Sequence, residues 1–325
     1  MRPKVLISRR VPPAALEIIG RHCDMDHNEP NRPLPPPELL ARLKGCQGLV
    51  CLLTDAIDDA VLATPGLKIV SNVAVGFNNI DVAAATRRRV LATNTPGVLD
   101  DTTADLAFAL LMATARRMVE ADNFLRAGKW EGWDLLQFLG HDVHHKTLGI
   151  CGLGRIGKAV AKRARGFDMR LLYADTVRAP EANERELGVT YVDKDTLLRE
   201  ADFVTIHVPL FAETRHYISD RELGLMKPTA ILVNAARGPI VDEAALVRAL
   251  QAKKIAGAGL DVYEEEPKVH PGLLGLDNVV LLPHIASASI ETRTRMATMA
   301  AKNVVAGIQG QRPPNLLNPE ALQTQ

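Results

Sequence analysis

Three glycines at G-x-G-x-x-G spacing are the strongest chemical signal in the sequence. The apolar run Leu148–Cys151 leads directly into Gly152-Leu153-Gly154-Arg155-Ile156-Gly157, and a helical pattern over Lys158–Arg165 follows. In this context the first glycine permits a tight turn, the second lets backbone approach a pyrophosphate, and the third lets the helix pack on the strand. The phosphates then meet N–H groups at the positive end of the helix. The motif therefore predicts a dinucleotide site rather than an empty glycine-rich turn.

An acidic residue follows at the expected distance. Asp175 lies 18 residues after Gly157, close to the roughly 20 of dinucleotide sites. A carboxylate there accepts hydrogen bonds from the adenosine ribose but repels a 2′-phosphate, which favours NAD. Arg178 keeps NADP open, because an arginine near that site could accept the phosphate, although it could equally be a surface charge.

Further short motifs occur in a fixed order around this site. They are Val75-Gly76-Phe77-Asn78-Asn79-Ile80-Asp81, Asn94-Thr95-Pro96-Gly97, Thr103-Ala104-Asp105, His207-Val208-Pro209-Leu210, Asn234-Ala235-Ala236-Arg237-Gly238, Asp261-Val262-Tyr263-Glu264-Glu265-Glu266-Pro267 and Pro283-His284-Ile285. Together with the glycine motif they resemble the D-isomer-specific 2-hydroxyacid dehydrogenases over nearly the whole chain. The resemblance implies an enzyme that reduces a 2-keto acid with a nicotinamide cofactor.

The resemblance also implies roles for individual residues. Arg237, Glu266 and His284 match the catalytic arginine, glutamate and histidine. The substrate-binding residues are the backbone N–H groups of Val75 and Gly76, together with Arg237 and Trp133. Besides the glycine motif and Asp175, the implied cofactor-binding residues are Thr103, Val208, Pro209, Thr214, Ala235, Ala236, Arg237, Asp261, His284 and Ala286.

The chemistry of these residue types suits the reaction independently of the resemblance. A guanidinium can pair with both the carboxylate and the carbonyl of a 2-keto acid and resists deprotonation, which suits Arg237. A histidine can give a proton to the developing alkoxide near neutral pH, which suits His284. A carboxylate paired with that imidazole favours its charged form, the role expected of Glu266.

Each catalytic residue also has a purely structural interpretation. Arg237 could cap a strand, His284 could be an ordinary loop histidine, and Glu266 is one of three successive glutamates. Glu266 is chosen because it directly precedes Pro267, as in the family pattern. The histidines His141, His144 and His145 could suggest a metal, but a solvated turn is the favoured interpretation and no metal site is predicted. Relatives usually have glycine at the position of His145, which affects only that turn.

The hydrophobic pattern predicts an α/β protein with alternating strands and helices. In the second half, strands are expected at 148–151, 170–173, 203–207, 231–234, 257–261 and 279–282, which are enough for a complete doubly wound sheet. In the first 98 residues, strands are expected at 4–8, 48–53, 69–73 and 90–92, with helices near 13–20, 38–43 and 81–88. The Pro-rich stretch 30–37 most simply begins a helix.

The expected architecture has two Rossmann-like domains. A dinucleotide-binding domain of residues 99–287 interrupts a flavodoxin-like substrate domain of residues 1–98 and 288–325, to which a helix over 290–308 returns, and substrate is expected in a cleft between the domains. A long helix over 102–118 and the irregular arm 128–140 are expected to form a homodimer, as the resemblance implies. In one branch of the family the second tryptophan of this arm, here Trp133, comes from the partner subunit and closes the pocket. Trp130 and Trp133 could instead be simple interface anchors.

Composition excludes several other classes of protein. The 39 Lys+Arg residues are balanced by 38 Asp+Glu residues, so no overall field attracts nucleic acid or an anionic membrane. No apolar stretch is long enough to span a bilayer, and the N-terminus lacks a secretory pattern. The four cysteines lack zinc-ligand spacing and suggest reduced thiols. A cytoplasmic location is therefore expected.

The substrate prediction is narrower and depends on further resemblance. The stretches 48–55, 128–133 and 312–315 resemble the glyoxylate/hydroxypyruvate reductase branch, so glyoxylate and hydroxypyruvate are the expected substrates. A 2-ketogluconate reductase or another D-2-hydroxyacid dehydrogenase is the alternative enzyme. A dinucleotide-sensing regulatory protein with this fold is a further alternative, which the presence of Arg237, Glu266 and His284 together disfavours.

Overall fold

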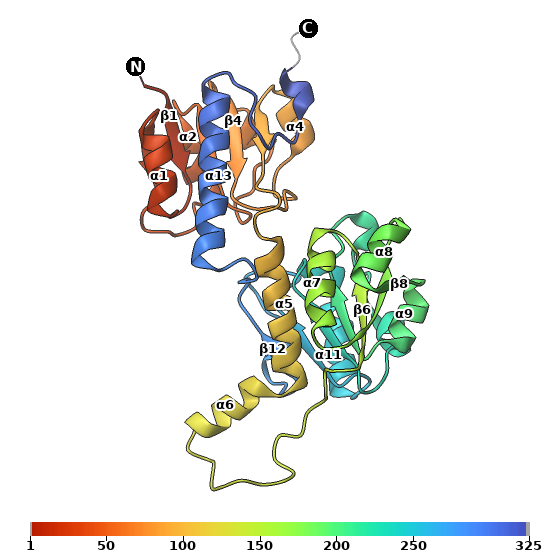
Figure 1. Ribbon diagram of the computed structural model, residues 1–325. Coiled ribbons are helices and arrows are strands. Elements are labelled where there is room, and N and C mark those ends of the chain that lie inside the picture. Colours follow the sequence, from red (N-terminus) through yellow and green to blue (C-terminus); the bar gives the residue numbers. More distant parts are fainter. Residues whose placement is uncertain (1, 323–325) are drawn as a thin grey trace. The chain divides into compact units, whose positions relative to one another are not determined.

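The computed structural model describes residues 2–322, and the chain divides into two compact units. One unit comprises Met1–Leu99 and Ala288–Gln325, and the other comprises Asp100–Ser287. Each unit is built on its own parallel sheet, with helices on both faces (Figure 1). The predicted α/β class is therefore confirmed.

The first unit contains a five-stranded parallel sheet with the order β2-β1-β3-β4-β5, the flavodoxin-like order. Helices α1 and α13 cover one face, and α2, α3 and α4 cover the other. The strands are β1 (Lys4–Ile7), β2 (Asp24–His27), β3 (Gly48–Cys51), β4 (Ile69–Asn72) and β5 (Leu91–Thr93). The helices are α1 (Pro13–Gly20), α2 (Pro36–Leu43), α3 (Asp59–Leu62), α4 (Val82–Arg87) and α13 (Ile290–Ile308), followed by the short η3 (Pro319–Leu322).

Strand β2 has no counterpart in the sequence prediction. Its residues Asp-Met-Asp-His are partly exposed, because the strand lies at the edge of the sheet and pairs only with β1. An edge strand needs no apolar run, so hydrophobic pattern cannot reveal it.

The second unit contains a seven-stranded parallel sheet with the order β12-β11-β10-β9-β6-β7-β8. From β8 to β11 this is the classic dinucleotide-binding order, extended by one strand. The strands are β6 (Thr147–Cys151), β7 (Arg170–Ala174), β8 (Val189–Tyr191), β9 (Phe203–Ile206), β10 (Ile231–Asn234), β11 (Gly257–Leu260) and β12 (Val279–Leu281). The edge strand β8 is partly exposed and was likewise missed by the sequence prediction.

Two hydrophobic clusters cover the faces of this sheet. Helices α5 (Asp100–Ala115) and α7 (Arg155–Arg165) pack on one face, and α9 (Lys194–Glu200), α10 (Asp220–Leu225) and α11 (Glu243–Gln251) pack on the other. The remaining helices are α6 (Met118–Arg126), α8 (Glu181–Leu187), α12 (Pro271–Leu274), η1 (Ala212–Thr214) and η2 (Gly238–Ile240).

The predicted helix over 102–118 is wrong at its C-terminal end. Helix α5 ends at Ala115, and Arg117 takes a left-handed conformation with φ 52° before α6 begins at Met118. Arg117 also makes a two-pronged ion pair with Glu120 in the new helix. The basic pair Arg116-Arg117, whose positive charge would also suit the C-terminus of a helix, thus marks the turn between two helices.

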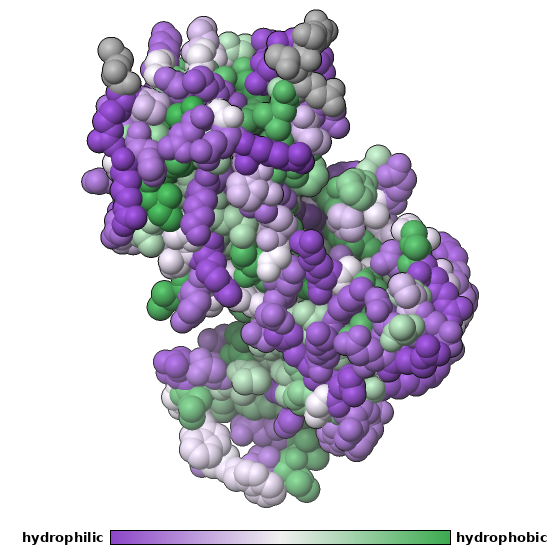
Figure 2. Space-filling model, turned by 45° about the horizontal axis from the view of Figure 1, so that its top comes forward, coloured by the Kyte–Doolittle hydropathy of each residue, from purple (hydrophilic) through white to green (hydrophobic). Residues whose placement is uncertain are grey.

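Residues 128–140 form no helix or strand and carry exposed apolar side chains. Trp133 is 82% exposed, and Leu135, Leu136 and Leu139 are also exposed. Apolar and weakly polar residues accordingly gather over this segment at the lower end of Figure 2. No helix among residues 2–322 is long and apolar enough to cross a membrane. The four cysteines are free and buried.

Candidate active site

The glycine motif forms the turn between β6 and α7. Gly152 has φ +92°, a conformation that favours glycine. A Cβ on Gly157 would lie 2.1 Å from the carbonyl oxygen of Gly152, so the helix can start this close to the strand only with glycine there. Gly154 precedes the first residue of α7, and a Cβ at this position would meet no atom within 4 Å. The open backbone at the start of an eleven-residue helix fits the phosphates of a dinucleotide.

Asp175 lies directly after β7 and beside this turn. Its Oδ2 accepts a hydrogen bond from the backbone N–H of Leu153 (2.8 Å), and its Oδ1 accepts one from the N–H of Thr176 (2.7 Å). The carboxylate is thereby held against the glycine motif, where an adenosine ribose is expected.

Arg178, which could accept the 2′-phosphate of NADP, is paired with another side chain of the same unit. Its guanidinium donates two hydrogen bonds to Glu184 (2.9 and 2.8 Å), and Glu184 also accepts one from the Tyr173 hydroxyl (2.6 Å). The bonds from Arg178, then that from Tyr173, lower the pKa of Glu184 to about 2. Glu184 therefore stays charged and holds Arg178.

His284 and Glu266 come together although 18 residues separate them. The His284 Nδ1 lies 2.8 Å from the Glu266 Oε2, and the backbone N–H of Tyr263 donates to the Glu266 Oε1 (3.1 Å). Burial raises the pKa of Glu266, but the bond and charge of His284, the Tyr263 N–H and the Arg237 charge outweigh it, so the net pKa is below its ordinary value. The pair therefore contains an ionised carboxylate at neutral pH.

The loop that carries His284 is fixed by Asp261 at the end of β11. The Asp261 carboxylate accepts hydrogen bonds from the backbone N–H groups of Ile285 (2.7 Å) and Ala286 (2.8 Å), and the Asp261 carbonyl accepts one from His284 (2.8 Å). These bonds stabilise His284 at φ 55°, a left-handed conformation that is costly for a residue with a Cβ. Burial raises the pKa of Asp261 more than the two N–H groups lower it, so the net pKa is above its ordinary value. Asp261 thus positions this loop, and its contact with the cofactor stays a prediction.

Arg237 follows β10 in a turn that Asn234 holds. The Asn234 amide donates to the Arg237 carbonyl (2.9 Å) and accepts from the Ala236 N–H (3.0 Å). Burial lowers the pKa of Arg237 more than the charge of Glu266 raises it, so the net pKa is below its ordinary value. The guanidinium nevertheless remains charged at neutral pH.

Gly238 brings the arginine loop against the glutamate loop. A Cβ at Gly238 would lie 1.8 Å from the backbone carbonyl of Tyr263, so only glycine permits this approach. The Tyr263 hydroxyl in turn donates to the Leu282 carbonyl (2.9 Å), two residues before His284. Tyr263 therefore contacts all three loops that carry the predicted catalytic residues. Sequence reasoning assigned no role to Tyr263 or Asn234, although both stand inside the motifs that it used.

Other predicted residues of this unit lie on the connections at the same edge of the sheet. Val208 and Pro209 follow β9, and the Thr214 hydroxyl donates to the Pro209 carbonyl (2.7 Å). Ala235 and Ala236 follow β10, and Thr103 is buried in α5. Val75 and Gly76 follow β4 in the other unit. Trp133 lies in the exposed arm.

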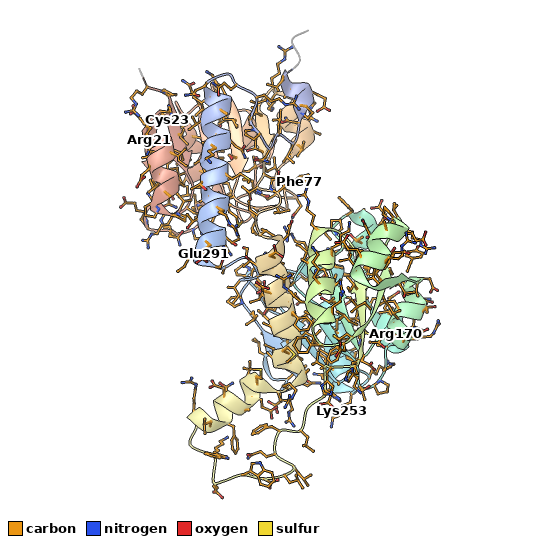
Figure 3. All side chains as sticks on the ribbon, in the orientation of Figure 1. Arg21, Cys23, Phe77, Arg170, Lys253 and Glu291 are labelled. Atoms are coloured by element: carbon orange, nitrogen blue, oxygen red, sulfur yellow. The ribbon has the colours of Figure 1, made fainter. Side chains whose placement is uncertain are left out.

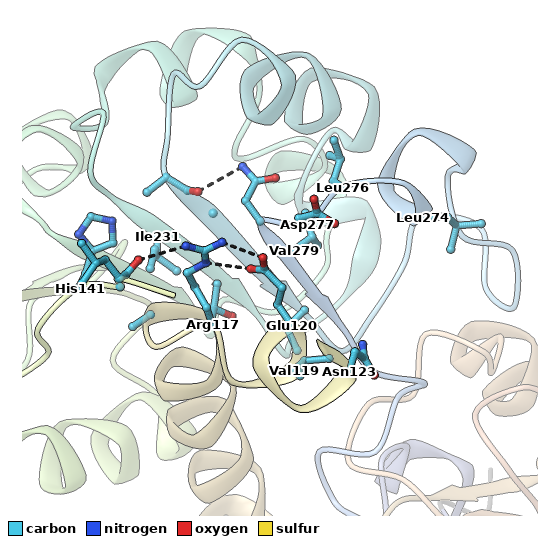
Figure 4. Close-up of a pocket in the computed structure, with 18 residues that line it drawn as sticks. Arg117, Val119, Glu120, Asn123, His141, Ile231, Leu274, Leu276, Asp277 and Val279 are labelled. Atoms are coloured by element: carbon cyan, nitrogen blue, oxygen red, sulfur yellow. Dashed lines mark hydrogen bonds and ion pairs between the residues drawn. The ribbon is translucent and has the colours of Figure 1, made fainter. Parts of the chain in front are cut away.

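A cavity of about 490 Å³ lies elsewhere in this unit (Figure 4). Its lining includes Ile231, Gly257 and Val279, which are at the N-terminal ends of their strands. Ligands of doubly wound sheets bind outside the carboxyl ends, so this cavity is not the predicted dinucleotide site. His141 lines the cavity, but within residues 2–322 no group of three or more His, Cys, Asp or Glu residues is placed to hold a metal ion.

Comparison with known proteins identifies the family. Residues 108–286 match the model of the D-isomer specific 2-hydroxyacid dehydrogenase NAD-binding domain. The chain is 53% identical to the glyoxylate reductase of Korarchaeum cryptofilum, covering 99% of this chain and 98% of that protein. It also resembles a solved Thermus thermophilus protein, with TM-score 0.91, 41% identity and coverage of 97% of this chain and 99% of that one. The NADPH-dependent glyoxylate/hydroxypyruvate reductase of Sinorhizobium meliloti, solved with NADP and malonate, has TM-score 0.88, 33% identity and coverage of 100% and 99%.

The protein therefore belongs to the D-isomer-specific 2-hydroxyacid dehydrogenase family and is an oxidoreductase with an NAD(P)-binding domain.

Proposed function

We propose that the protein reduces glyoxylate and hydroxypyruvate to glycolate and D-glycerate, with NADH as its preferred cofactor. The observation that carries the substrate proposal is the identity of 53% over 99% of the chain with a glyoxylate reductase. The pairing of His284 with Glu266 supports the chemistry, because it provides a proton donor held by a carboxylate.

In this proposal each predicted catalytic residue has one task. The bound nicotinamide supplies the hydride that reaches the carbonyl carbon. Arg237 binds the substrate carbonyl and carboxylate, and its charge stabilises the developing alkoxide. Because the His284 Nδ1 is bonded to Glu266, the Nε2 is left to give its proton to that alkoxide. Glu266 stays ionised and stabilises the imidazolium before transfer.

The preference for NADH is supported at the ribose end of the site. Asp175 presents a negative charge beside the glycine motif, and a 2′-phosphate would be repelled by it. Arg178 is bound in two places to Glu184 and stacks over the ring of Tyr191, 5.8 Å from its centroid. Arg178 would therefore have to break its ion pair with Glu184 before it could bind a 2′-phosphate.

We further propose a cytoplasmic homodimer in which the arm of residues 128–140 packs on the partner. The exposed Trp133, Leu135 and Leu136 support this, because an isolated chain would leave these large apolar side chains in water. In this arrangement Trp133 narrows the partner's substrate site and favours small, polar keto acids.

A series of substrates tests the proposal directly. We expect kcat/KM with NADH to be highest for glyoxylate and hydroxypyruvate and lower for pyruvate, 2-ketoisocaproate and 2-ketogluconate. One methylene changes selectivity by about 10–200-fold, so weaker activity on the neighbouring acids is expected. If kcat/KM for 2-ketogluconate or for 2-ketoisocaproate were tenfold higher than for glyoxylate, the substrate assignment would be wrong. The assignment to the dehydrogenase class would still hold. Cofactor binding without turnover of any acid would instead favour a dinucleotide sensor.

A further inference from the structure

Three successive peptide carbonyls in the loop after β4 accept hydrogen bonds from donors of the same unit. The Ala74 carbonyl accepts a hydrogen bond from the backbone N–H of Thr95 (2.9 Å). The Val75 carbonyl accepts one from the side-chain amide of Asn94 (2.8 Å), and the Gly76 carbonyl accepts one from that of Asn72 (2.9 Å). Figure 3 labels Phe77, the next residue of this loop, which is 42% exposed.

The inward carbonyls determine where the following N–H groups point. In a planar trans peptide the C=O and the N–H point in opposite directions. The N–H groups of Val75, Gly76 and Phe77 therefore all turn away from the asparagine side of the loop. None of the three has an acceptor within the described part of the chain. Successive N–H groups on one side form a concave anion-binding site.

The two asparagines are well suited to hold this arrangement. Asn72 ends β4 and is fully buried, and Asn94 directly follows the neighbouring strand β5 and is nearly buried. An amide donates to a carbonyl without adding a charge that would compete for an anion nearby. Asn72 is itself oriented by Asn79, whose amide donates to the carbonyls of Leu52 (3.1 Å) and Asp55 (3.0 Å).

We propose that Asn94 and Asn72 are positioning residues for the substrate carboxylate. They orient the Val75 and Gly76 peptides, and the inward Gly76 carbonyl adds the N–H of Phe77 as a third donor. The inference rests on the proposed function, in which a 2-keto acid presents its carboxylate to this loop. It assigns much of the affinity for that carboxylate to two neutral side chains that do not touch it.

The test compares affinity for a carboxylate with turnover. Asn94→Asp keeps the size of the side chain but replaces the donating NH2 with an oxygen that repels the Val75 carbonyl. We expect KM for glyoxylate, and Ki for the carboxylate inhibitor oxamate, to rise about tenfold. We expect a change of less than about threefold in kcat and an unchanged Kd for NADH. Asn72→Ala should act in the same direction through Gly76.

The matched control is Asn318→Ala in the same unit. Asn318 is also buried, and its amide donates to the Val90 carbonyl (2.9 Å) before β5 begins, away from the loop. This control should lower the melting temperature and leave both KM and Ki within twofold of wild type. A folded Asn94→Asp with unchanged Ki for oxamate would overturn the proposal. So would a rise in Ki for Asn318→Ala equal to that for Asn94→Asp.

A calorimetric titration of oxamate separates this proposal from the proposed function. It measures binding to the intact enzyme in the presence of NADH and needs no turnover. If the wild type reduces no 2-keto acid but oxamate binding is weakened by Asn94→Asp, the substrate assignment fails and the role of the loop holds. If both variants bind oxamate as the wild type does, the role of the loop is wrong whatever the substrate is.

Discussion

The two units present different chemistry at the carboxyl ends of their strands. In the seven-stranded unit, charged side chains follow the strands: Asp175 after β7, Arg237 after β10, and Asp261 and Glu266 after β11. In the five-stranded unit the loop after β4 is held by neutral amides, those of Asn72 and Asn94, and its peptide N–H groups remain available. The predicted site residues thus include charged side chains in the seven-stranded unit, whereas the loop after β4 offers backbone dipoles.

This difference separates two kinds of functional information. A proton donor or an ion pair must be a particular residue type, so its loss should change the rate. A peptide N–H belongs to every residue except proline, so its direction depends on the side chains behind it, and their loss should change affinity. Variants of the charged residues test this division in the seven-stranded unit, as the Asn94 variant tests it in the other.

The largest effect is expected for His284→Ala. Removing the proton donor should lower kcat by roughly 100-fold or more, because general acid catalysis contributes about 10²–10⁴. The Kd for NADH, measured by fluorescence titration, should stay nearly unchanged. His144→Ala removes an exposed histidine of the same unit and is the control. If His284→Ala keeps more than half of the wild-type rate, the proton comes from elsewhere.

An intermediate effect is expected for Glu266→Gln, measured as the pH profile of kcat for reduction. The pKa of Glu266 is below its ordinary value, so its carboxylate is ionised at neutral pH and is neutralised only in acid. The amide cannot stabilise the imidazolium that donates the proton. The pH at which half of the activity is lost as the solution becomes more alkaline should therefore move down by about one unit. Glu265→Gln changes the neighbouring glutamate and should leave the profile unchanged. An equal shift in both variants would show a general charge effect rather than the specific pair.

The smallest of the three effects is expected for Asp175→Ala. Without the carboxylate, the ratio of kcat/KM for NADPH to kcat/KM for NADH should rise on the order of tenfold. The reason is that the partly solvated repulsion between the carboxylate and the 2′-phosphate is removed. Glu181→Ala removes an exposed carboxylate in α8 and should not change this ratio. A wild-type preference for NADPH would mean that Arg178 or a neighbour outweighs Asp175.

Much of the fold could be predicted from the sequence because buried parallel strands are short apolar runs. The helices α1 (Pro13–Gly20) and α13 (Ile290–Ile308) and the strand β10 (Ile231–Asn234) have the predicted bounds. The exposed edge strands β2 and β8 lack such runs and were missed. The end of α5 was misplaced because the left-handed turn at Arg117 occurs at a residue type that also suits a helix end. His145, where the resemblance to the family implies glycine, likewise has a positive φ of 61°.

The amino-acid sequence by itself determined the residue types of the candidate site and the glycine turn of the predicted dinucleotide site, because charge, proton transfer and a positive φ each require particular residue types. Their catalytic and binding roles stay predictions. Only the tertiary structure decided that Glu266 meets the expected partner His284 at Nδ1, that Glu184 holds Arg178, and that two asparagines turn the peptides after β4. The physical reason is that these contacts join loops from different strands, and the distance and direction between two loops are set by the packed sheet beneath them.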